Sequence, residues 1–361
     1  MNTLFSAACR LLRQGEHIVF VTIALQSGST PRESGAKMIV RQDGSIMGTV
    51  GGGLVEAQCM VLGQKLLNGI YAPEKETPEA AAEIAVVKNF DLTNEEAAKA
   101  AMVCGGRLTV VAQRISPDAQ GHTAGLSGAA ALEAVHECLS QGVACGLSTE
   151  LTQLTPLDTT VTPDATETCF AVEGYFVTPL SSSPNAITSA KLQCSDSSCR
   201  FVEQFSPQPR MIIFGAGHVA QPTAHLAAMT GFAVTVLDDR PEFANEQRFP
   251  EAKNIVLPDF EHSFADLTIT PQCYIVIMTR GHLHDKTVLE QALQTPATYI
   301  GMIGSRRKRD TLYERMRNEG VTDEAIARCH CPIGLDIGGQ TPEEIAVSIM
   351  AEVIRHRAQN S

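Results

Sequence analysis

One segment of this sequence, Met211–Ala220, constrains the fold more than any other, because it joins an apolar strand to a helix through a glycine-rich turn. Its letters, MIIFGAGHVA, match the pattern G-x-G-x-x-A. Gly215 permits the tight turn, and Gly217 lets the backbone approach a pyrophosphate. Ala220 allows close packing of the helix on the sheet, and the start of the helix supplies N–H donors and a partial positive charge. The segment therefore predicts a dinucleotide- or nucleotide-type site.

An acidic pair supports this prediction. Asp238 and Asp239 end the next predicted strand, at the distance of about 20 residues where an acid binds a ribose hydroxyl in such folds. An acid at this position disfavours a 2′-phosphate, so the sequence favours NAD over NADP. His218, inside the turn, joins the candidate contacts. A glycine turn that binds no ligand is the alternative.

Strands and helices alternate after Met211, which is typical of a parallel sheet with helices on both faces. The expected class is therefore α/β, with a C-terminal Rossmann-like unit. Expected strands are 211–215, 233–238, 254–257, 274–279 and 298–303, and expected helices are 218–230, 285–294, 306–319 and 322–328. A last helix begins at the segment TPEE, where Thr341 is the cap and Glu344 closes a capping box.

The segment TRGHLHD follows the predicted strand 274–279 and is expected to lie at the same edge as the glycine turn. Thr279, Arg280 and His282 are candidate ligand contacts on this loop. Two alternatives stay open: a metal site built from His282, His284 and Asp285, or a helix-capping loop with solvated histidines.

The segment GMIGSRRKR ends another predicted strand and starts a helix. Gly304 and Ser305 are candidates to hold an anion, with one arginine beside it. Four consecutive basic residues cover the whole circumference of a helix, so most of Arg306–Arg309 is expected to face water. A nucleic-acid patch is disfavoured by the acidity of the whole chain.

The N-terminal part carries two further glycine-rich loops, Gln26–Gly35 and Gly51–Gly53, of which the second opens a helix and offers free N–H groups. Together with nearby cations they predict a site for an anionic ligand, and a purely conformational role of the glycines is the alternative. The candidate contacts are Gly28, Ser29, Arg32, Lys37, Gly51, Gly52 and Gly53.

Cysteine usage predicts reduced thiols and no structural zinc. Eleven cysteines are an odd, scattered set, which argues against a secreted disulfide framework. Neither Cys329-His330-Cys331 nor the pair Cys194 and Cys199 has a second CxxC-type partner at zinc-site spacing. Cys104 lies beside a flexible Gly-Gly turn and is either a small buried hydrophobe or a functional thiol.

The composition of the chain limits the kinds of partner that we expect it to bind. The net charge of −12 has the wrong sign for a phosphate backbone, and aromatic residues are only 5%, without Trp, so no nucleic acid is expected. The uncharged stretch 211–237 contains too many glycines and histidines for a bilayer helix, and the first residues do not form a signal peptide. We therefore expect a cytoplasmic protein without a membrane partner.

We expect three regions along the chain. Residues 1–115 form an N-terminal α/β domain, with a buried strand at 17–25 and a hairpin around Asp43-Gly44. Residues 116–209 form a Ser/Thr-rich middle segment and linker, whose part in completing the N-terminal domain stays open. Residues 210–361 form the Rossmann-like domain.

Eight segments together resemble the xanthine dehydrogenase accessory factors, the XdhC/CoxI family. They are SGSTPRESGAKM, TVGGGLVE, CGG, FGAGHVA, VLDDRPEFA, TRGHLHD, YIGMIGSRRKR and PIGLDIGGQTPEEIAVSIMAE. They follow the family's order within 17–112 and 210–356, and the resemblance does not extend to 113–209. Joint matches of this length are far more specific than G-x-G-x-x-A alone.

This resemblance implies a protein that binds molybdenum cofactor. Together with a cysteine desulfurase, such a protein assists the replacement of an oxo ligand on molybdenum by a sulfido ligand. It then delivers the sulfurated cofactor to an apo-hydroxylase of the xanthine dehydrogenase or aldehyde oxidoreductase type. Cys104 matches the family's CGG thiol, which would lie near the molybdenum or its dithiolene. Arg32, Lys37 and the N-terminal glycine loops would face the pterin phosphate. The glycine turn with Asp238 would bind a nucleotide, either NAD or the cytosine dinucleotide form of the cofactor, and a homodimer is expected.

Two other functions stay open on the sequence. An NAD-dependent oxidoreductase would use the same Rossmann half, with His282 or His284 as its acid/base. A non-catalytic, nucleotide-sensing regulator of hydroxylase maturation would need only the nucleotide site.

Overall fold

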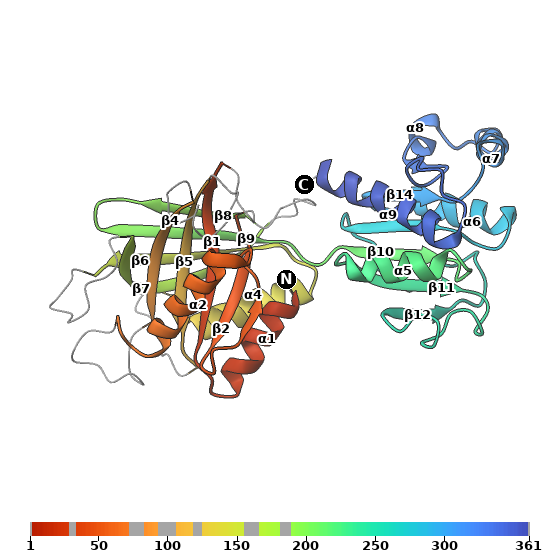
Figure 1. Cartoon of the computed structure of the whole chain (residues 1–361). Helices are drawn as coiled ribbons and strands as arrows, with labels where there is room; N and C mark the ends of the chain where they lie inside the picture. The colour runs from red at the N-terminus through yellow and green to blue at the C-terminus, as the bar shows by residue number, and fades with distance from the viewer. Residues whose placement is uncertain are drawn as a thin grey trace. The chain divides into compact units, whose positions relative to one another are not determined.

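The structure is a computed structural model, and it describes residues 2–28, 34–71, 83–92, 106–117, 125–154, 166–180 and 189–359. It divides the chain into two compact units, Met1–Pro207 and Gln208–Ser361 (Figure 1). The N-terminal unit is built on an antiparallel sheet and the C-terminal unit on a parallel one. The α/β class with a C-terminal Rossmann-like sheet is therefore confirmed.

The N-terminal sheet has nine strands in the order β3-β2-β1-β5-β4-β7-β6-β9-β8. The strands are β1 (Ile18–Ser27), β2 (Lys37–Arg41), β3 (Ile46–Gly48), β4 (Ile84–Asp91), β5 (Arg107–Ile115), β6 (Cys145–Gln153), β7 (Glu167–Pro179), β8 (Ser189–Cys194) and β9 (Ser198–Phe205). The expected hairpin is confirmed: β2 pairs with β3 across Asp43-Gly44, and Gly44 adopts φ +82°.

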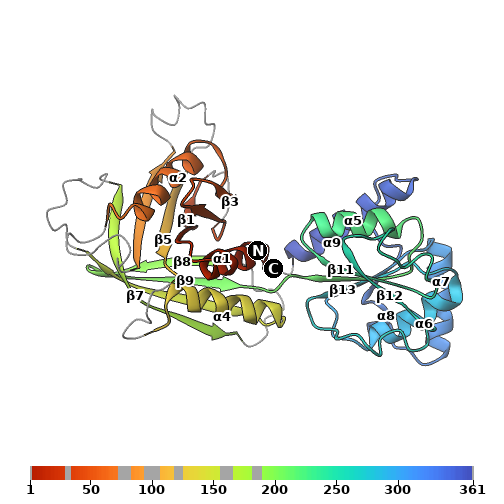
Figure 2. The same ribbon diagram turned by 90° about the horizontal axis from the view of Figure 1, so that it is seen from below.

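Helices cover both faces of this sheet, as Figure 2 shows. On one face lies α2 (Gly53–Leu67), whose Leu62 and Leu66 pack on Val21 and Val40. On the other face lie α1 (Asn2–Arg13) and α4 (Gly128–Ser140), which share a second core with the opposite side chains of the same strands. The central strands therefore have no side that faces water, and this explains their almost continuous apolar character.

The middle segment 116–209 belongs to this same unit. Its strands β6, β7, β8 and β9 are part of the sheet, and its helix α4 packs on one face of the sheet. The hydroxyl of Ser34 donates to the carbonyl of Ala190 at 2.9 Å, which links the loop before β2 to β8. Cys194 and Cys199 form a disulfide across the β8–β9 hairpin. The expectation that all thiols are reduced is therefore wrong for this pair, because the hairpin places the two residues directly opposite each other.

The C-terminal sheet has the order β12-β11-β10-β13-β14-β15, and all its strands are parallel. The strands are β10 (Arg210–Phe214), β11 (Ala233–Asp238), β12 (Ala252–Val256), β13 (Cys273–Ile277), β14 (Tyr299–Met302) and β15 (Cys329–His330). The helices are α5 (Ala220–Met229), α6 (His282–Leu293), α7 (Arg306–Asn318), α8 (Asp323–Ile326) and α9 (Pro342–Gln359). Helices α5 and α9 pack on one face, and α6, α7 and α8 pack on the other.

Two local predictions about this unit have different outcomes. The capping box is confirmed, since the amide of Glu344 donates to the hydroxyl of Thr341 at 3.2 Å and the amide of Thr341 donates to the Glu344 carboxylate at 3.1 Å. The helix expected at 285–294 instead begins at His282, directly after Gly281, whose φ of +101° ends the preceding turn. Over the residues that the structure covers, no helix combines the length and apolar character needed to cross a membrane.

Candidate functional site

The C-terminal edge of the parallel sheet gathers the candidate residues of this unit. Phe214, the last residue of β10, pairs with Leu237 of β11 and Ile277 of β13, so the turns after these strands lie at one edge. The strand order reverses between β10 and β13, and ligands bind at such switch points in open α/β sheets. The edge therefore brings together the turn at Gly215–Gly217 and the candidates Asp238, Asp239, Thr279, Arg280, Gly304 and Ser305.

The two glycines of the turn differ in the space around them. Gly215 has φ +105°, and a Cβ added there would lie 2.2 Å from the carbonyl oxygen of Met278. A Cβ added at Gly217 would meet no atom within 4 Å. Gly215 is therefore required for the close approach of β10 and β13, whereas Gly217 leaves open space above the turn.

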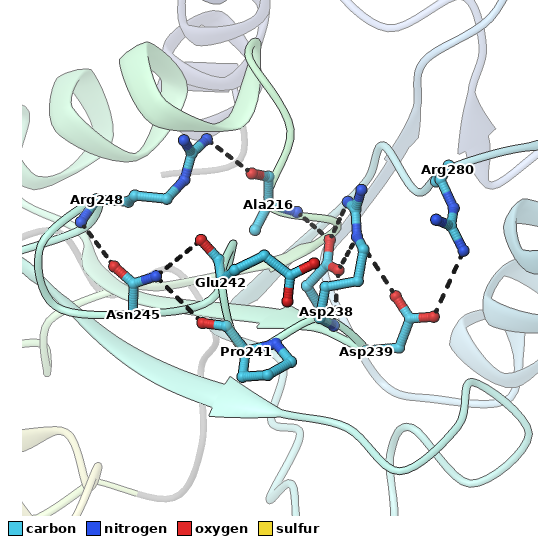
Figure 3. A network of polar contacts seen from close by, with 9 residues as sticks. Ala216, Asp238, Asp239, Pro241, Glu242, Asn245, Arg248 and Arg280 are labelled. Atoms are coloured by element: carbon cyan, nitrogen blue, oxygen red, sulfur yellow. Dashed lines mark hydrogen bonds and ion pairs between the residues drawn. The ribbon is translucent and has the colours of Figure 1, made fainter.

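Asp238 is 1% exposed and accepts four hydrogen bonds (Figure 3). The amide of Ala216 donates to Oδ2 at 2.7 Å, which ties the acid to the glycine turn. Arg240 supplies the other three, from its amide and Nε to Oδ1 and from Nη2 to Oδ2. Burial alone would raise the pKa of Asp238, but the hydrogen bonds from Arg240 and Ala216 hold the pKa below its usual value.

The other side of the turn is held by Arg248, which donates to the carbonyl of Ala216 at 3.2 Å. Asn245 accepts from the amide of Arg248 and donates to the carbonyls of Pro241 and Glu242 (Figure 3). Hydrogen bonds within the protein thus fix both polar groups of the Ala216 backbone.

Asp239 is held less tightly than its neighbour. Its side chain is 27% exposed and lies 3.7 Å from Arg240 and 4.0 Å from Arg280, longer than a hydrogen bond in both cases. Arg280 extends from the turn after β13 and is 64% exposed. Both groups are more accessible than Asp238, whose side chain is 2% exposed (Figure 3).

The start of α6 is organised by a buried acid. Asp285 is fully buried and accepts from the amide and hydroxyl of Thr279 at 3.1 and 2.6 Å, and Lys308 pairs with its second oxygen. The ring of His284 packs on Phe260, with centroids 4.7 Å apart. Among the side chains that the structure describes, which exclude that of His282, no cluster of three potential metal ligands is found. Thr279 is thus bonded to Asp285 within the helix, whereas Gly281, the cap residue, makes no side-chain cap bond. The ligand-contacting loop and the capping loop therefore both stay predictions.

The four basic residues Arg306–Arg309 at the start of α7 have different surroundings. Ser305 caps the helix and accepts from the amide of Lys308 at 3.1 Å, while Arg309 donates to Asp310 and to the carbonyl of Cys331. Arg306 and Arg307 are exposed, as expected for most of the run. An open cavity of about 490 Å³ lies beside the helix, and its basic lining residues are Lys286, Arg307, Lys308 and Arg315.

The N-terminal unit brings its glycine-rich segments to one end of its sheet. Ser27, at the end of β1, pairs with Arg107 at the start of β5, so Gly28 and Gly106 lie at this end. Met38 of β2 pairs with Gly48 at the end of β3, which places the turn Gly51–Gly53 there too. All three glycines of the turn have positive φ, and Cβ atoms added at Gly52 or Gly53 would meet nothing within 4 Å.

An acid of the protein also holds this second turn. The Oε2 atom of Glu56 accepts from the amides of Val50 and Gly52 at 3.2 and 3.3 Å and from the hydroxyl of Thr49. The amide of Gly51 donates to the Thr49 hydroxyl at 3.1 Å. Some of the N–H groups expected to be free are therefore already bonded.

The ammonium group of Lys37 is held in the core, although the backbone of Lys37 lies at the same end of the sheet as the glycine turn. It is 7% exposed, its ammonium pairs with Glu203, and it donates to the hydroxyl of Thr22 at 2.8 Å. It lies between the aromatic rings of Phe20 and Phe205, in the core that α1 and α4 cover. Ser29, Arg32 and Cys104 lie outside the described residues.

Sequence reasoning missed at least three residues of these sites, Glu56, Arg240 and Arg248. Glu56 follows the glycine turn at the start of α2, which is where a capping acid is common, so this signal was available. Arg248 lies far along the chain from Ala216, and no local pattern marks it.

Fold and site together define a two-unit protein with a Rossmann-type sheet and a second glycine-rich site in an antiparallel unit. Family models match both parts: the XdhC and CoxI family over residues 11–70, and the XdhC Rossmann domain over 211–353. The chain therefore belongs to the XdhC/CoxI family.

Relatives match along nearly the whole chain. A Bacillus subtilis protein described as a probable subunit of xanthine dehydrogenase is 28% identical over 359 residues, which is 96% of this chain and 95% of that protein. The molybdenum cofactor insertion chaperone PaoD of Escherichia coli is 23% identical, over 98% of this chain and 87% of that protein. A crystal structure described as a xanthine dehydrogenase from Bacillus halodurans has 25% identity and a TM-score of 0.72, and the match covers 99% of this chain and 96% of that one.

Proposed function

We propose that this protein is an accessory factor of a xanthine dehydrogenase-type molybdenum hydroxylase, and that it binds molybdenum cofactor and inserts it into the apo-enzyme. The names of two relatives, one linked to xanthine dehydrogenase and one a molybdenum cofactor insertion chaperone, support this role. The observation that carries the proposal is the meeting of Gly28, Gly106 and the turn Gly51–Gly53 at one end of the N-terminal sheet.

The open turn at the start of α2 supports a place for the phosphate of the cofactor. Gly52 and Gly53 leave open space at the start of α2, where a phosphate is favoured by the helix dipole. Glu56 occupies two amides of the turn, so a phosphate would bind beside it or displace it. When bound, the cofactor would supply a molybdenum ion held by dithiolene sulfur. Lys37 is not part of this proposal, because Glu203 and Thr22 hold it inside the core.

The C-terminal unit would bind a nucleotide, either NAD or a cytosine nucleotide. The open space at Gly217 and the charged groups at the edge of the sheet support this part. Three partners belong to the proposal: the apo-hydroxylase, a cysteine desulfurase that supplies sulfur, and a second copy of this chain in a homodimer.

The direct test is the content of protein that is freshly isolated without oxygen. We expect molybdenum by metal analysis and a fluorescent oxidised pterin after release, and mass spectrometry identifies the form of the cofactor. Protein that is made in cells with active cofactor synthesis and contains neither would contradict the proposal. Steady oxidation of NADH with small carbonyl substrates would instead indicate an oxidoreductase.

Cys104→Ala is expected to lower molybdenum retention or sulfido content while leaving the unfolding temperature unchanged, because the proposal assigns this thiol to the cofactor. Cys138→Ala on α4 is the matched control, since this half-buried thiol packs against the core shared by α1 and α4. Equal retention and equal transfer in Cys104→Ala and the parent protein would exclude a role of the thiol.

Alkylation should separate Cys104 from the buried thiols. Burial raises the pKa of Cys59 and Cys329 to about 12, and that of Cys169 and Cys331 to about 11, so at pH 8 these groups hold only a trace of the reactive thiolate. A brief iodoacetamide pulse followed by peptide mass spectrometry should therefore label Cys104 before these four thiols in the cofactor-free protein. Faster labelling of Cys59 or Cys329 than of Cys104 would contradict this expectation.

A further inference from the structure

The acid that Rossmann sites ordinarily offer to a ribose is already saturated in this protein. A carboxylate has about four lone-pair positions, and Asp238 accepts four hydrogen bonds from Ala216 and Arg240 at 2.7–3.1 Å. It is also 1% exposed. A ribose hydroxyl would have to displace one of these donors and leave a buried polar group unpaired, which costs about 1–3 kcal/mol.

Its neighbour Asp239 is more exposed and has longer contacts with arginines. The Nε atom of Arg240 lies 2.8 Å from Asp238 and 3.7 Å from Asp239, so the two carboxylates converge on one nitrogen although they are adjacent in sequence. Asp239 is more exposed, at 27%, and its two ion pairs are longer than hydrogen bonds.

The position of Asp239 also suits a ligand at the switch point. Its second partner, Arg280, follows β13, and β10 with the glycine turn lies between β11 and β13 in the sheet. The Asp239 carboxylate therefore comes within 4.0 Å of a residue that follows β13, across the end of β10. Figure 3 shows Asp239 between Asp238 and Arg280.

We propose that Asp239 binds the 2′,3′-diol of a ribonucleotide, and that Asp238 is a positioning residue that holds the glycine turn through Ala216. The proposal rests on the nucleotide site of the proposed function and specifies its ligand class: a nucleoside diphosphate group with both ribose hydroxyls free. Arg240 neutralises Asp238, and this leaves Asp239 as the accessible acceptor for the sugar.

The test uses the full chain and two matched pairs of probes, ADP with 2′-deoxy-ADP and CDP with 2′-deoxy-CDP, in calorimetric titrations. We expect the parent protein to bind at least one ribonucleotide about tenfold more tightly than its 2′-deoxy form, as loss of a hydrogen bond to a charged group predicts. Asp239→Ala should remove this preference without lowering the unfolding temperature. Glu242→Ala, which removes an exposed acid a few residues further on, should keep it.

Asp238→Asn provides the opposite readout. It should lower the unfolding temperature, because an amide nitrogen replaces one acceptor of the network, and it should keep the preference for the ribose. A preference that survives in Asp239→Ala and is lost in Asp238→Asn would overturn the inference and leave the nucleotide site intact. Failure of all four probes to bind the parent protein would overturn both the inference and the nucleotide part of the proposed function. Molybdenum retention tests the other part of the proposed function, the binding of molybdenum cofactor, separately.

Discussion

Replacing Gly215 by alanine should destabilise the C-terminal unit by about 3 kcal/mol or more, because the residue combines an unfavourable φ with a steric overlap. The new Cβ would lie 2.2 Å from the carbonyl oxygen and 2.6 Å from the carbonyl carbon of Met278, both backbone atoms at the end of β13. For a unit of this size, we expect an unfolding temperature lower by roughly 6–12 °C. Calorimetry measures this shift, and hydrogen exchange with mass spectrometry locates the loss of protection in the peptides of 211–353.

Gly217→Ala is the matched control for this prediction. Its Cβ would meet nothing within 4 Å, and its backbone does not require glycine, so the unfolding temperature should stay within about 1–2 °C of the parent value. The methyl group would instead fill the space above the turn and weaken nucleotide binding. Equal stability losses in the two variants would show that the turn is not constrained as described.

Lys37→Met should destabilise the N-terminal unit by about 3–5 kcal/mol, because it leaves the carboxylate of Glu203 buried without its partner. Both side chains are almost fully buried, at 3% and 4% exposure. Burial lowers the pKa of Lys37, while Glu203 beside it acts in the opposite direction and favours the charged pair. The chain has no Trp, so the measurement is denaturant unfolding followed by circular dichroism.

The double variant Lys37→Met with Glu203→Leu tests the reason for this loss. In the double variant neither charge of this pair is left buried without its partner. Stability should therefore recover to within about 1–2 kcal/mol of the parent protein. A double variant that is as unstable as Lys37→Met alone would mean that packing, and not the unpaired acid, causes the loss.

The sequence was a good guide to the C-terminal unit, because its turns and strands depend on local patterns. Gly215, the alternation of strands and helices, and the cap at Thr341 each carry a signal within a few residues. The spacing that marked Asp238 correctly placed it beside the glycine turn. Spacing carries no information about which groups bond to that acid, and here Arg240 and Ala216 bond to it.

The N-terminal unit was harder to predict, because its contacts join residues far apart in sequence. Lys37 stands in a short strand beside glycine-rich loops, which favours a ligand contact. Its partner Glu203 lies on β9, and helices cover both faces of the sheet, so the ammonium lies in a core that no local pattern indicates. The same holds for the middle segment, whose strands extend a sheet that begins near the N-terminus.

Both glycine-rich turns are completed by an acid of the protein itself, Glu56 in one unit and Asp238 in the other. These amides are therefore bonded without any ligand, and the turns keep their hydrogen bonds when nothing is bound. In the proposed carrier role, the protein would stay folded after it released the cofactor. Transfer would then depend on whether the carrier or the recipient enzyme makes the stronger contacts with the cofactor.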